Sequence, residues 1–282
     1  MLQNKHISLS ASLLLFVYII QVQAGPSSLT PGAEPDSDQV VQVLLLGDST
    51  VQGSVTRAVE PEADQLEDVV RKLLDAEGDL PPVRVINEGR GGEYVRGLLD
   101  NRYETVLKDN PKADVITIRY GLNDYGKREG FHDNFKGDLV ELIERLRRDY
   151  PDAKIYLETV IVYFDETKSG EINERVLQAA EETGVPVIDM YARTEAEREA
   201  GNTCLTYHRV PIDRIPEKYH SLLPEPWREG EICVLDNRLD AHLKDVPGWF
   251  GDKHPNLAGY HVIGDELAIQ LAPAIRERYS EN

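Results

Sequence analysis

Four short polar segments contain residue types that together would perform nucleophilic catalysis. They are Gly47-Asp48-Ser49-Thr50, Asn87 to Gly92 (NEGRGG), Gly121-Leu122-Asn123-Asp124 and Gly251 to Asn256 (GDKHPN). A serine and an imidazole within hydrogen-bond reach form a nucleophile and its base. Taken singly, each segment has a simpler explanation, because serine, asparagine and aspartate cap helices and glycine permits tight turns. The order and placement of the segments must decide between these interpretations.

Short runs of Val, Ile and Leu predict the strands that would position the segments. Segments with a helical hydrophobic period lie between these runs, and the alternation indicates βαβ units with a parallel sheet covered on both faces. The expected fold is a three-layer α/β/α sandwich with a five-stranded parallel sheet. The predicted strands are Val40–Leu46, Val83–Ile86, Asp114–Ile118, Ile155–Val162 and Val185–Ile188, and the predicted helices are Asp64–Asp75, Asn134–Arg148 (capped by His132 and Asp133), Glu171–Thr183 and Asn256–Arg278.

The first three polar segments directly follow the first three predicted strands, and the fourth introduces the last helix. In an open parallel sheet, ligands bind beyond the carboxyl ends of the strands. The four segments are therefore expected at one rim of the sheet.

In this order the segments resemble the four blocks of the SGNH or GDSL-type hydrolases. Gly47-Asp48-Ser49-Thr50 resembles the first block, Asn87-x-Gly89-x-x-Gly92 the second, and Gly121-Leu122-Asn123-Asp124 the third. The run from His254 to Tyr260 (HPNLAGY) is similar to the family's ending H-P-N-x-x-G-Y. The resemblance covers about residues 40–275 and implies a flavodoxin-like SGNH-hydrolase fold.

The resemblance also implies roles for individual residues. Ser49 would be the nucleophile and His254 its base, because a serine hydroxyl must lose its proton to attack. The N–H groups of Ser49 and Gly92 and the side-chain amide of Asn123 would form the oxyanion hole. The sequence has no G-x-S-x-G, since Val51 stands where the second glycine would be, and this disfavours an α/β-hydrolase.

The catalytic acid departs from the family pattern. The family usually has D-x-x-H, but position 251 is Gly, and the nearest acid is Asp252, two residues before His254. Asp252 is the preferred candidate. Asp245 or Asp240 would be an alternative, and so would a Ser–His dyad oriented by a backbone carbonyl.

Two further pairs of residues have both a functional and a structural interpretation. Asp48 and Asp124 follow the family pattern, but capping of backbone groups at the strand ends explains them at least as well. Trp227 and Trp249 would form a sugar-stacking or acyl-binding surface, although buried packing is the preferred explanation.

Composition excludes several classes of protein. The 282 residues include 31 Lys and Arg against 50 Asp and Glu, a net charge of −19, which argues against nucleic acid as a partner. The sequence has only two cysteines and no H-E-x-x-H motif, so it contains no recognisable metal-binding pattern. Neither a metal nor a cofactor is therefore expected. The length suits one domain with a substantial core.

The N-terminus has the three parts of a signal peptide. Lys5 precedes the apolar run Ile7–Ile20, and cleavage is predicted after Ala24. An uncleaved membrane anchor is the alternative, but the run is short for a span of about 20 residues. The mature protein is therefore expected to be secreted or periplasmic, without stable membrane insertion.

The rest of the chain divides at two places. Residues 25–39 are rich in Pro, Ser, Gly and acidic residues and should be a flexible linker before the hydrolase domain, residues 40–282. Residues 201–251 break the strand–helix rhythm and should be an elaborated insertion that forms part of the substrate wall, and not a second domain with its own core. Cys204 and Cys233 would form a disulfide after export, or remain two buried thiols.

The sequence as a whole predicts an exported serine esterase acting through an acyl-enzyme on Ser49. The substrate would be a small-molecule or polysaccharide ester, most plausibly an acetyl or short acyl ester of a carbohydrate. Three alternatives remain: a non-hydrolytic carbohydrate-binding homologue, motivated by the glycine at position 251, an O-acyltransferase, and a lysophospholipase or thioesterase.

Overall fold

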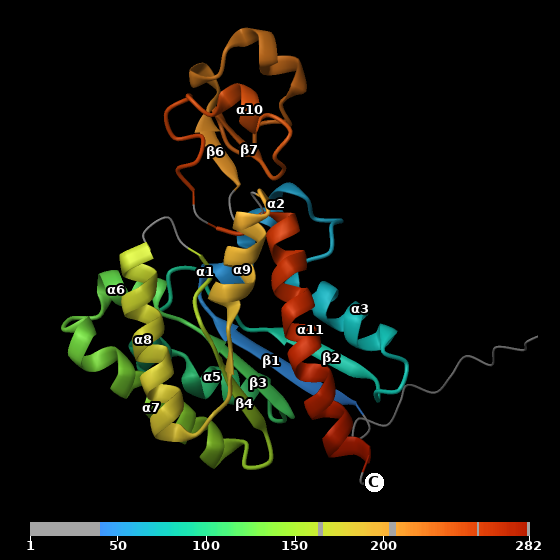
Figure 1. Ribbon diagram of the computed structural model, residues 1–282, viewed down its shortest axis with the longest axis vertical. Coiled ribbons are helices and arrows are strands. Elements are labelled where there is room, and N and C mark those ends of the chain that lie inside the picture. The colour runs from blue at the N-terminus through green and yellow to red at the C-terminus, as the bar shows by residue number, and fades with distance from the viewer. Residues whose placement is uncertain (1–39, 163–165, 203–206, 253, 281–282) are drawn as a thin grey trace, which may run out of the picture. The chain divides into compact units, whose positions relative to one another are not determined.

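Five parallel strands form the central sheet of the computed structural model, which describes residues 40–162, 166–202, 207–252 and 254–280 (Figure 1). The order is β2-β1-β3-β4-β5, as in flavodoxin-like folds, and it confirms the predicted three-layer α/β/α class. All described residues belong to one compact unit. The strands are β1 (Val41–Gly47), β2 (Val83–Asn87), β3 (Val115–Arg119), β4 (Lys154–Glu158) and β5 (Val187–Ile188).

Alternate residues of the strands supply two separate apolar clusters, one on each face of the sheet. On β1, Leu44 and Leu46 belong to one cluster, and Val43 and Leu45 belong to the other. This follows from the two-residue period of a strand, and it explains why strands buried on both faces are continuous apolar runs in the sequence.

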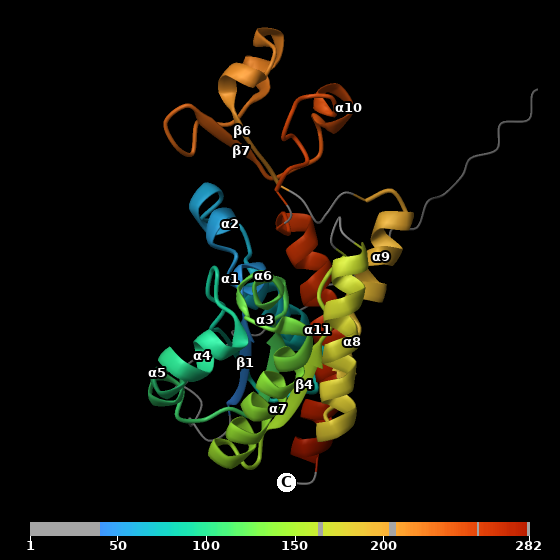
Figure 2. The same cartoon turned by 90° about the vertical axis from the view of Figure 1, so that its left-hand side faces the viewer.

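Helices complete the two outer layers (Figure 2). The first cluster includes apolar residues of α4 (Val95–Asn101), α5 (Tyr103–Asp109), α7 (Phe131–Asp149) and α8 (Glu166–Thr183). The second includes residues of α3 (Leu66–Ala76) and α11 (Leu257–Ser280), together with Met190 of α9 (Met190–Glu199). The remaining helices of this part are α1 (Ser49–Gln52), α2 (Ser54–Val59) and α6 (Leu122–Lys127).

The fourth strand is shorter than predicted. It ends at Glu158 rather than at Val162, because the following backbone groups bond to side chains of neighbouring helices. The N–H of Val160 donates to Asn173 Oδ1 at 2.8 Å, and the N–H of Val162 donates to Thr194 Oγ1 at 2.9 Å. These side chains replace the backbone partners that a fifth strand of full length would supply.

Helix α7 begins three residues earlier than predicted, so the assignment of His132 and Asp133 as caps was wrong. The helix starts after Gly130, whose φ of 60° lies in the left-handed region that favours glycine. The ring of Phe131 stacks on Phe135 with centroids 5.1 Å apart, which fixes the first turn on the core.

The insertion contains a small apolar cluster of its own. It contains the antiparallel hairpin of β6 (His208–Pro211) and β7 (Glu231–Val234), the short helices η2 (Ile212–Arg214), η3 (Glu217–Leu222) and α10 (Asp240–Leu243), and the buried Trp249. Trp249 is fully buried, so its packing interpretation is confirmed, whereas Trp227 is half-buried.

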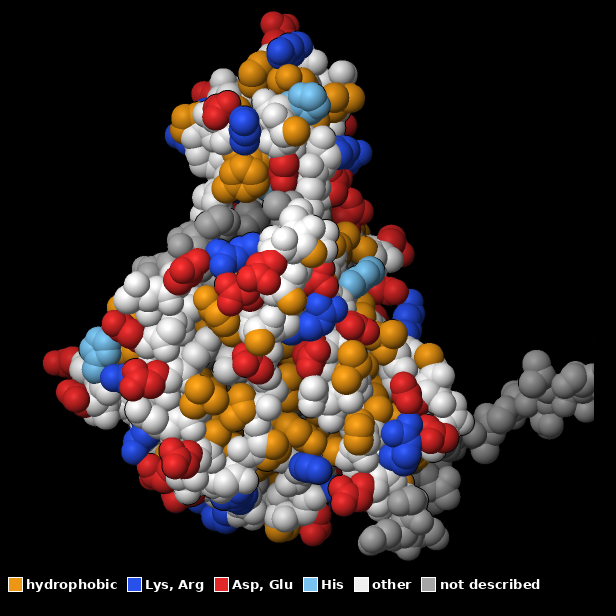
Figure 3. Space-filling model, viewed as in Figure 1, with side chains coloured by type: hydrophobic (Ala, Val, Ile, Leu, Met, Phe, Trp, Pro, Cys, Tyr) orange, Lys and Arg blue, Asp and Glu red, His pale blue; other side chains and the backbone are white. Residues whose placement is uncertain are grey.

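Some predictions concern residues outside this description. The proposed signal peptide and linker, residues 1–39, lie outside the described residues, and so does Cys204, although its proposed partner Cys233 is buried on β7. Within the described ranges, the helices are too short or too polar to cross a membrane. Figure 3 shows acidic and basic side chains interspersed on one face of the molecule.

Candidate active site

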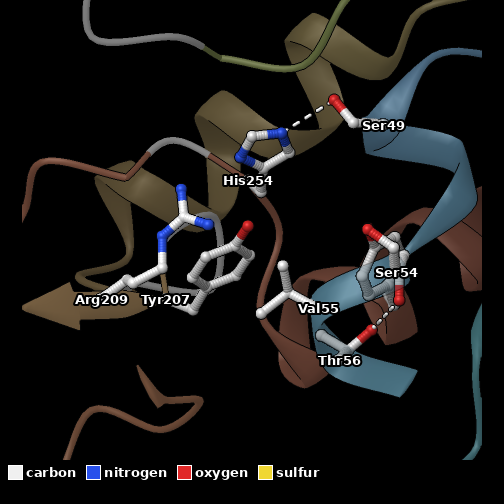
Figure 4. Close-up of a pocket in the computed structure, with 9 residues that line it drawn as sticks. Ser49, Ser54, Val55, Thr56, Tyr207, Arg209 and His254 are labelled. Atoms are coloured by element: carbon white, nitrogen blue, oxygen red, sulfur yellow. Dashed lines mark hydrogen bonds between the residues drawn. The ribbon is translucent and has the colours of Figure 1, made fainter. Parts of the chain in front are cut away.

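Ser49 and His254 form a hydrogen-bonded pair at the carboxyl end of β1. Ser49 is the first residue of α1, and its Oγ lies 2.8 Å from Nε2 of His254, which precedes α11 (Figure 4). The preceding Asp48 caps α1, since its Oδ1 accepts a hydrogen bond from the N–H of Thr50 at 2.8 Å. The serine hydroxyl is therefore not used as the helix cap and remains available to the imidazole.

Asp252 contacts the other nitrogen of the imidazole. Its Oδ1 lies 2.6 Å from His254 Nδ1, and its side chain is 7% exposed. Because an ionised carboxylate only accepts hydrogen bonds, Nδ1 carries the proton and Nε2 accepts from Ser49. The alternative acids lie elsewhere: Asp240 Oδ1 is 2.7 Å from His208 Nε2, and Asp245 is exposed.

The loop that carries Gly92 follows β2 and is fastened to α1. Gly92 has a φ of 75°, and the adjacent Gly91 N–H donates to Gln52 Oε1 at 2.8 Å. Gly89 approaches α1 so closely that a Cβ there would lie 2.4 Å from the backbone N of Gln52. Glycine is therefore required at position 89 for this loop to pack against α1.

Asp124 connects the segments that carry Gly92 and Asn123. It is fully buried; its Oδ1 accepts from the N–H of Val95 at 2.8 Å and its Oδ2 from the N–H of Gly121 at 3.0 Å. Burial raises the pKa of Asp124 to about 7, although both backbone hydrogen bonds oppose the increase. These contacts match the capping interpretation of Asp124, and Asn123 lies beside it in the first turn of α6.

We expect Asp124→Asn to lower the free energy of unfolding by about 1–3 kcal/mol near pH 5. An asparagine directs its NH₂ group at one of the two N–H donors, which is left buried without an acceptor. The comparison is made by urea denaturation.

The same variant should also change the pH dependence of stability. Because the pKa of Asp124 is higher in the folded protein than in the unfolded chain, the folded protein binds the extra proton and loses stability as the pH rises from about 4 to about 7. Asp124→Asn should remove this loss, which amounts to about 3 kcal/mol. Parallel pH profiles of the variant and the wild type would contradict the assignment.

A buried charge pair supports α1, the helical turn that begins at Ser49. Arg119 on β3 and Glu158 on β4 are each 1% exposed and lie 2.7 Å apart, and Arg119 also donates to the carbonyl of Thr50 at 3.0 Å. Sequence reasoning missed both residues, although a charged residue at the end of each of two apolar strands was a usable indication.

The pair of Ser49 and His254 opens into a cavity of about 140 Å³. Its walls come from α1, α2, the insertion and the start of α11 (Figure 4). Sequence reasoning missed the two residues of the insertion that reach it, since that region has no regular period. The lining residues are Ser49, Gly53, Ser54, Val55, Thr56, Tyr207, Arg209, His254 and Tyr260.

The described part of the chain offers no group of three or more His, Cys, Asp or Glu side chains placed to hold a metal ion.

A serine, an imidazole and a carboxylate in hydrogen-bonded series at the carboxyl edge of a parallel sheet define a serine hydrolase. Residues 45–262 match the GDSL-like lipase/acylhydrolase family, and the chain belongs to this family. It is thus an ester-hydrolysing serine hydrolase. No curated protein matches the sequence significantly.

Solved structures share the fold at low sequence identity. Axe2, an acetylxylan esterase from Geobacillus stearothermophilus, is 18% identical with a TM-score of 0.54, over 82% of this chain and 94% of that one. The acetyl xylan esterase AlAXEase is 18% identical with a TM-score of 0.53, over 82% of this chain and 100% of that one. LAE5, an α/β hydrolase from the metagenome of Lake Arreo, Spain, is 16% identical with a TM-score of 0.55, over 83% and 96%.

Proposed function

We propose that this protein is an exported esterase that removes acetyl or other short acyl groups from carbohydrates. The observation that carries the proposal is the series Ser49–His254–Asp252, with contacts of 2.8 and 2.6 Å, at a small cavity. The acetylxylan esterases of similar fold support the carbohydrate part. The apolar run before Ala24 supports export.

The reaction proceeds in two halves. In the first, Ser49 Oγ attacks the ester carbonyl while His254 Nε2 takes the hydroxyl proton, and the sugar alcohol leaves with that proton. In the second, His254 takes a proton from water as the water oxygen attacks the acyl-serine, and the imidazolium then gives that proton to Ser49 Oγ as the carboxylic acid leaves. Asp252 stabilises the imidazolium that forms in both halves.

The negative charge of each tetrahedral intermediate needs fixed donors. The N–H groups of Ser49 and Gly92 and the side-chain amide of Asn123 provide them in this proposal. The hydrogen bonds of Gln52 and Asp124 hold the segments that carry Gly92 and Asn123 in place before substrate binds. Little reorganisation of these donors is therefore needed as charge develops.

The size of the cavity favours a short acyl group. A volume of about 140 Å³ is well below the roughly 300–1,000 Å³ of pockets that enclose drug-sized ligands. Tyr207 and Arg209 border the same space, so its walls are partly polar. A long alkyl chain would exceed this volume.

A substrate panel tests this proposal. We expect kcat/KM for p-nitrophenyl acetate to exceed that for p-nitrophenyl octanoate at least about tenfold, because the longer chain fits the cavity only if its walls move, at a cost of about 1–3 kcal/mol. Acetylated xylo-oligosaccharides should release acetate, and Ser49→Ala should release none above the buffer rate.

Other outcomes would replace the proposal. Preference for octanoate or for a lysophospholipid would indicate a lipid acylhydrolase. Transfer of acetyl to excess xylo-oligosaccharide in preference to water would indicate an acyltransferase. The glycine at position 251 no longer favours a non-hydrolytic protein, because Asp252 occupies the position beside the imidazole.

A further inference from the structure

The strand β6 directs alternate side chains to two different places. His208 and Val210 point into the insertion, where His208 stacks on Trp249 with ring centroids 4.2 Å apart and Val210 joins the apolar cluster. Tyr207 and Arg209 point the opposite way and border the cavity of the active site (Figure 4). This is the two-residue period of a strand, with one face used for folding and the other facing the catalytic residues.

Arg209 binds the oxygen of Asp252 that the imidazole does not use. A guanidinium nitrogen of Arg209 lies 2.7 Å from Asp252 Oδ2, while Oδ1 faces His254 Nδ1 at 2.6 Å. The carboxylate is 7% exposed and the arginine 33% exposed. A charge-assisted hydrogen bond in such a partly buried position is stronger than an ion pair on the protein surface.

The arginine is itself held in place from the insertion. Its backbone lies opposite Cys233 in the hairpin, and its guanidinium lies 5.6 Å from the centre of the Trp227 ring. Tyr207, two residues earlier, stacks on the His254 imidazole at 5.6 Å with an angle of 16°. Arg209 on β6 and Tyr207 directly before it thus contact the acid and the base.

We propose that Arg209 is a positioning residue that fixes Asp252 for its contact with His254, so that the insertion completes the catalytic array. The proposal rests on the proposed hydrolysis through Ser49. It also accounts for the spacing D-x-H: only one residue separates the acid from the histidine, and a partner outside this short loop holds the carboxylate in line with Nδ1. Arg209 acts through Asp252 and not by binding the ester.

The first test is the kinetics of Arg209→Gln. We expect kcat to fall about 10- to 100-fold, as for loss of one hydrogen bond to a charged group, while KM changes by less than about threefold. Arg209→Lys should recover a large part of kcat, because it restores the cation. Arg214→Gln, which changes an exposed arginine of the same insertion, is the matched control and should retain wild-type kinetics.

A double-mutant cycle distinguishes positioning from substrate binding. In the Asp252→Asn background, Arg209→Gln should change kcat by less than about threefold, because its effect passes through the missing carboxylate. A full additional loss, or an effect of Arg209→Gln confined to KM, would overturn the proposal.

A third measurement does not need turnover. The Nδ1 proton of His254 should give a downfield NMR resonance in the wild type and in Arg214→Gln, and this resonance should broaden or vanish in Arg209→Gln. Circular dichroism verifies that each variant is folded, and Arg209→Lys provides the comparison if Arg209→Gln is not. Equal ester hydrolysis by wild type and Ser49→Ala would reject the proposed function alone, whereas an unchanged resonance in Arg209→Gln would reject the role of Arg209.

Discussion

Ser49→Ala should lower kcat for ester hydrolysis by about 10⁴- to 10⁶-fold, in the range found when a serine nucleophile is removed from other hydrolases. Alanine removes only the hydroxyl, so it keeps the backbone N–H proposed for the oxyanion hole but leaves His254 without a proton to accept. The variant should still fold, because Asp48 and not Ser49 caps α1. Its free energy of unfolding should therefore stay within about 1 kcal/mol of the wild type.

The measurement is the initial rate with p-nitrophenyl acetate, together with labelling by a fluorophosphonate followed by intact mass. The wild type should gain one phosphonyl group, and Ser49→Ala should gain none. Ser221→Ala, an exposed serine of the insertion, is the control and should be labelled like the wild type. Equal hydrolysis by wild type and Ser49→Ala would mean that another group performs the reaction.

The strands of the sheet were predictable because burial on both faces requires runs of apolar residues in the sequence. In β1, residues 43–46 are all buried and all Val or Leu, so this part of the strand is a continuous apolar run in the sequence. The end of β4 was not predictable in this way. Ile161 and Val162 are apolar like the strand, but Asn173 and Thr194, distant in sequence, supply acceptors that take their segment out of the ladder.

The residues of the candidate site also differ in whether the sequence could predict them. Ser49 and His254 were predictable because they stand in short blocks that resemble a known family, and the structure places them 2.8 Å apart. Arg209 was not predictable, because it stands in a region without period or motif. Its contact with Asp252 depends on the alternation of β6, which only the folded hairpin makes visible.

The choice of acid was open in the sequence for a geometric reason. Spacing alone does not say whether a residue two positions before a histidine can reach its Nδ1, since this depends on the path of the intervening backbone. The structure brings Asp252 to 2.6 Å and engages Asp240 with His208 and with the indole N–H of Trp249. Asp240 is thus bound within the core of the insertion, and Asp252 is the candidate acid that contacts the imidazole.

Asp252→Asn should lower kcat by about 10³- to 10⁴-fold, as when an orienting aspartate is replaced in other serine hydrolases. An asparagine that donates its NH₂ to Nδ1 stabilises the tautomer with the proton on Nε2, and this nitrogen then no longer accepts the proton of Ser49. The amide also fails to stabilise the imidazolium. Binding of the ester should change little, so the loss appears in kcat.

The control is Asp245→Asn, which removes the same charge from an exposed position of the insertion and should keep wild-type kinetics. If Asp252→Asn retains kcat within about threefold of the wild type, the imidazole does not depend on this carboxylate, and a dyad oriented by a backbone carbonyl becomes the better description. If both variants lose activity equally, the cause is the net charge of the insertion and not the contact at 2.6 Å. Only a loss confined to Asp252→Asn agrees with a catalytic acid at position 252.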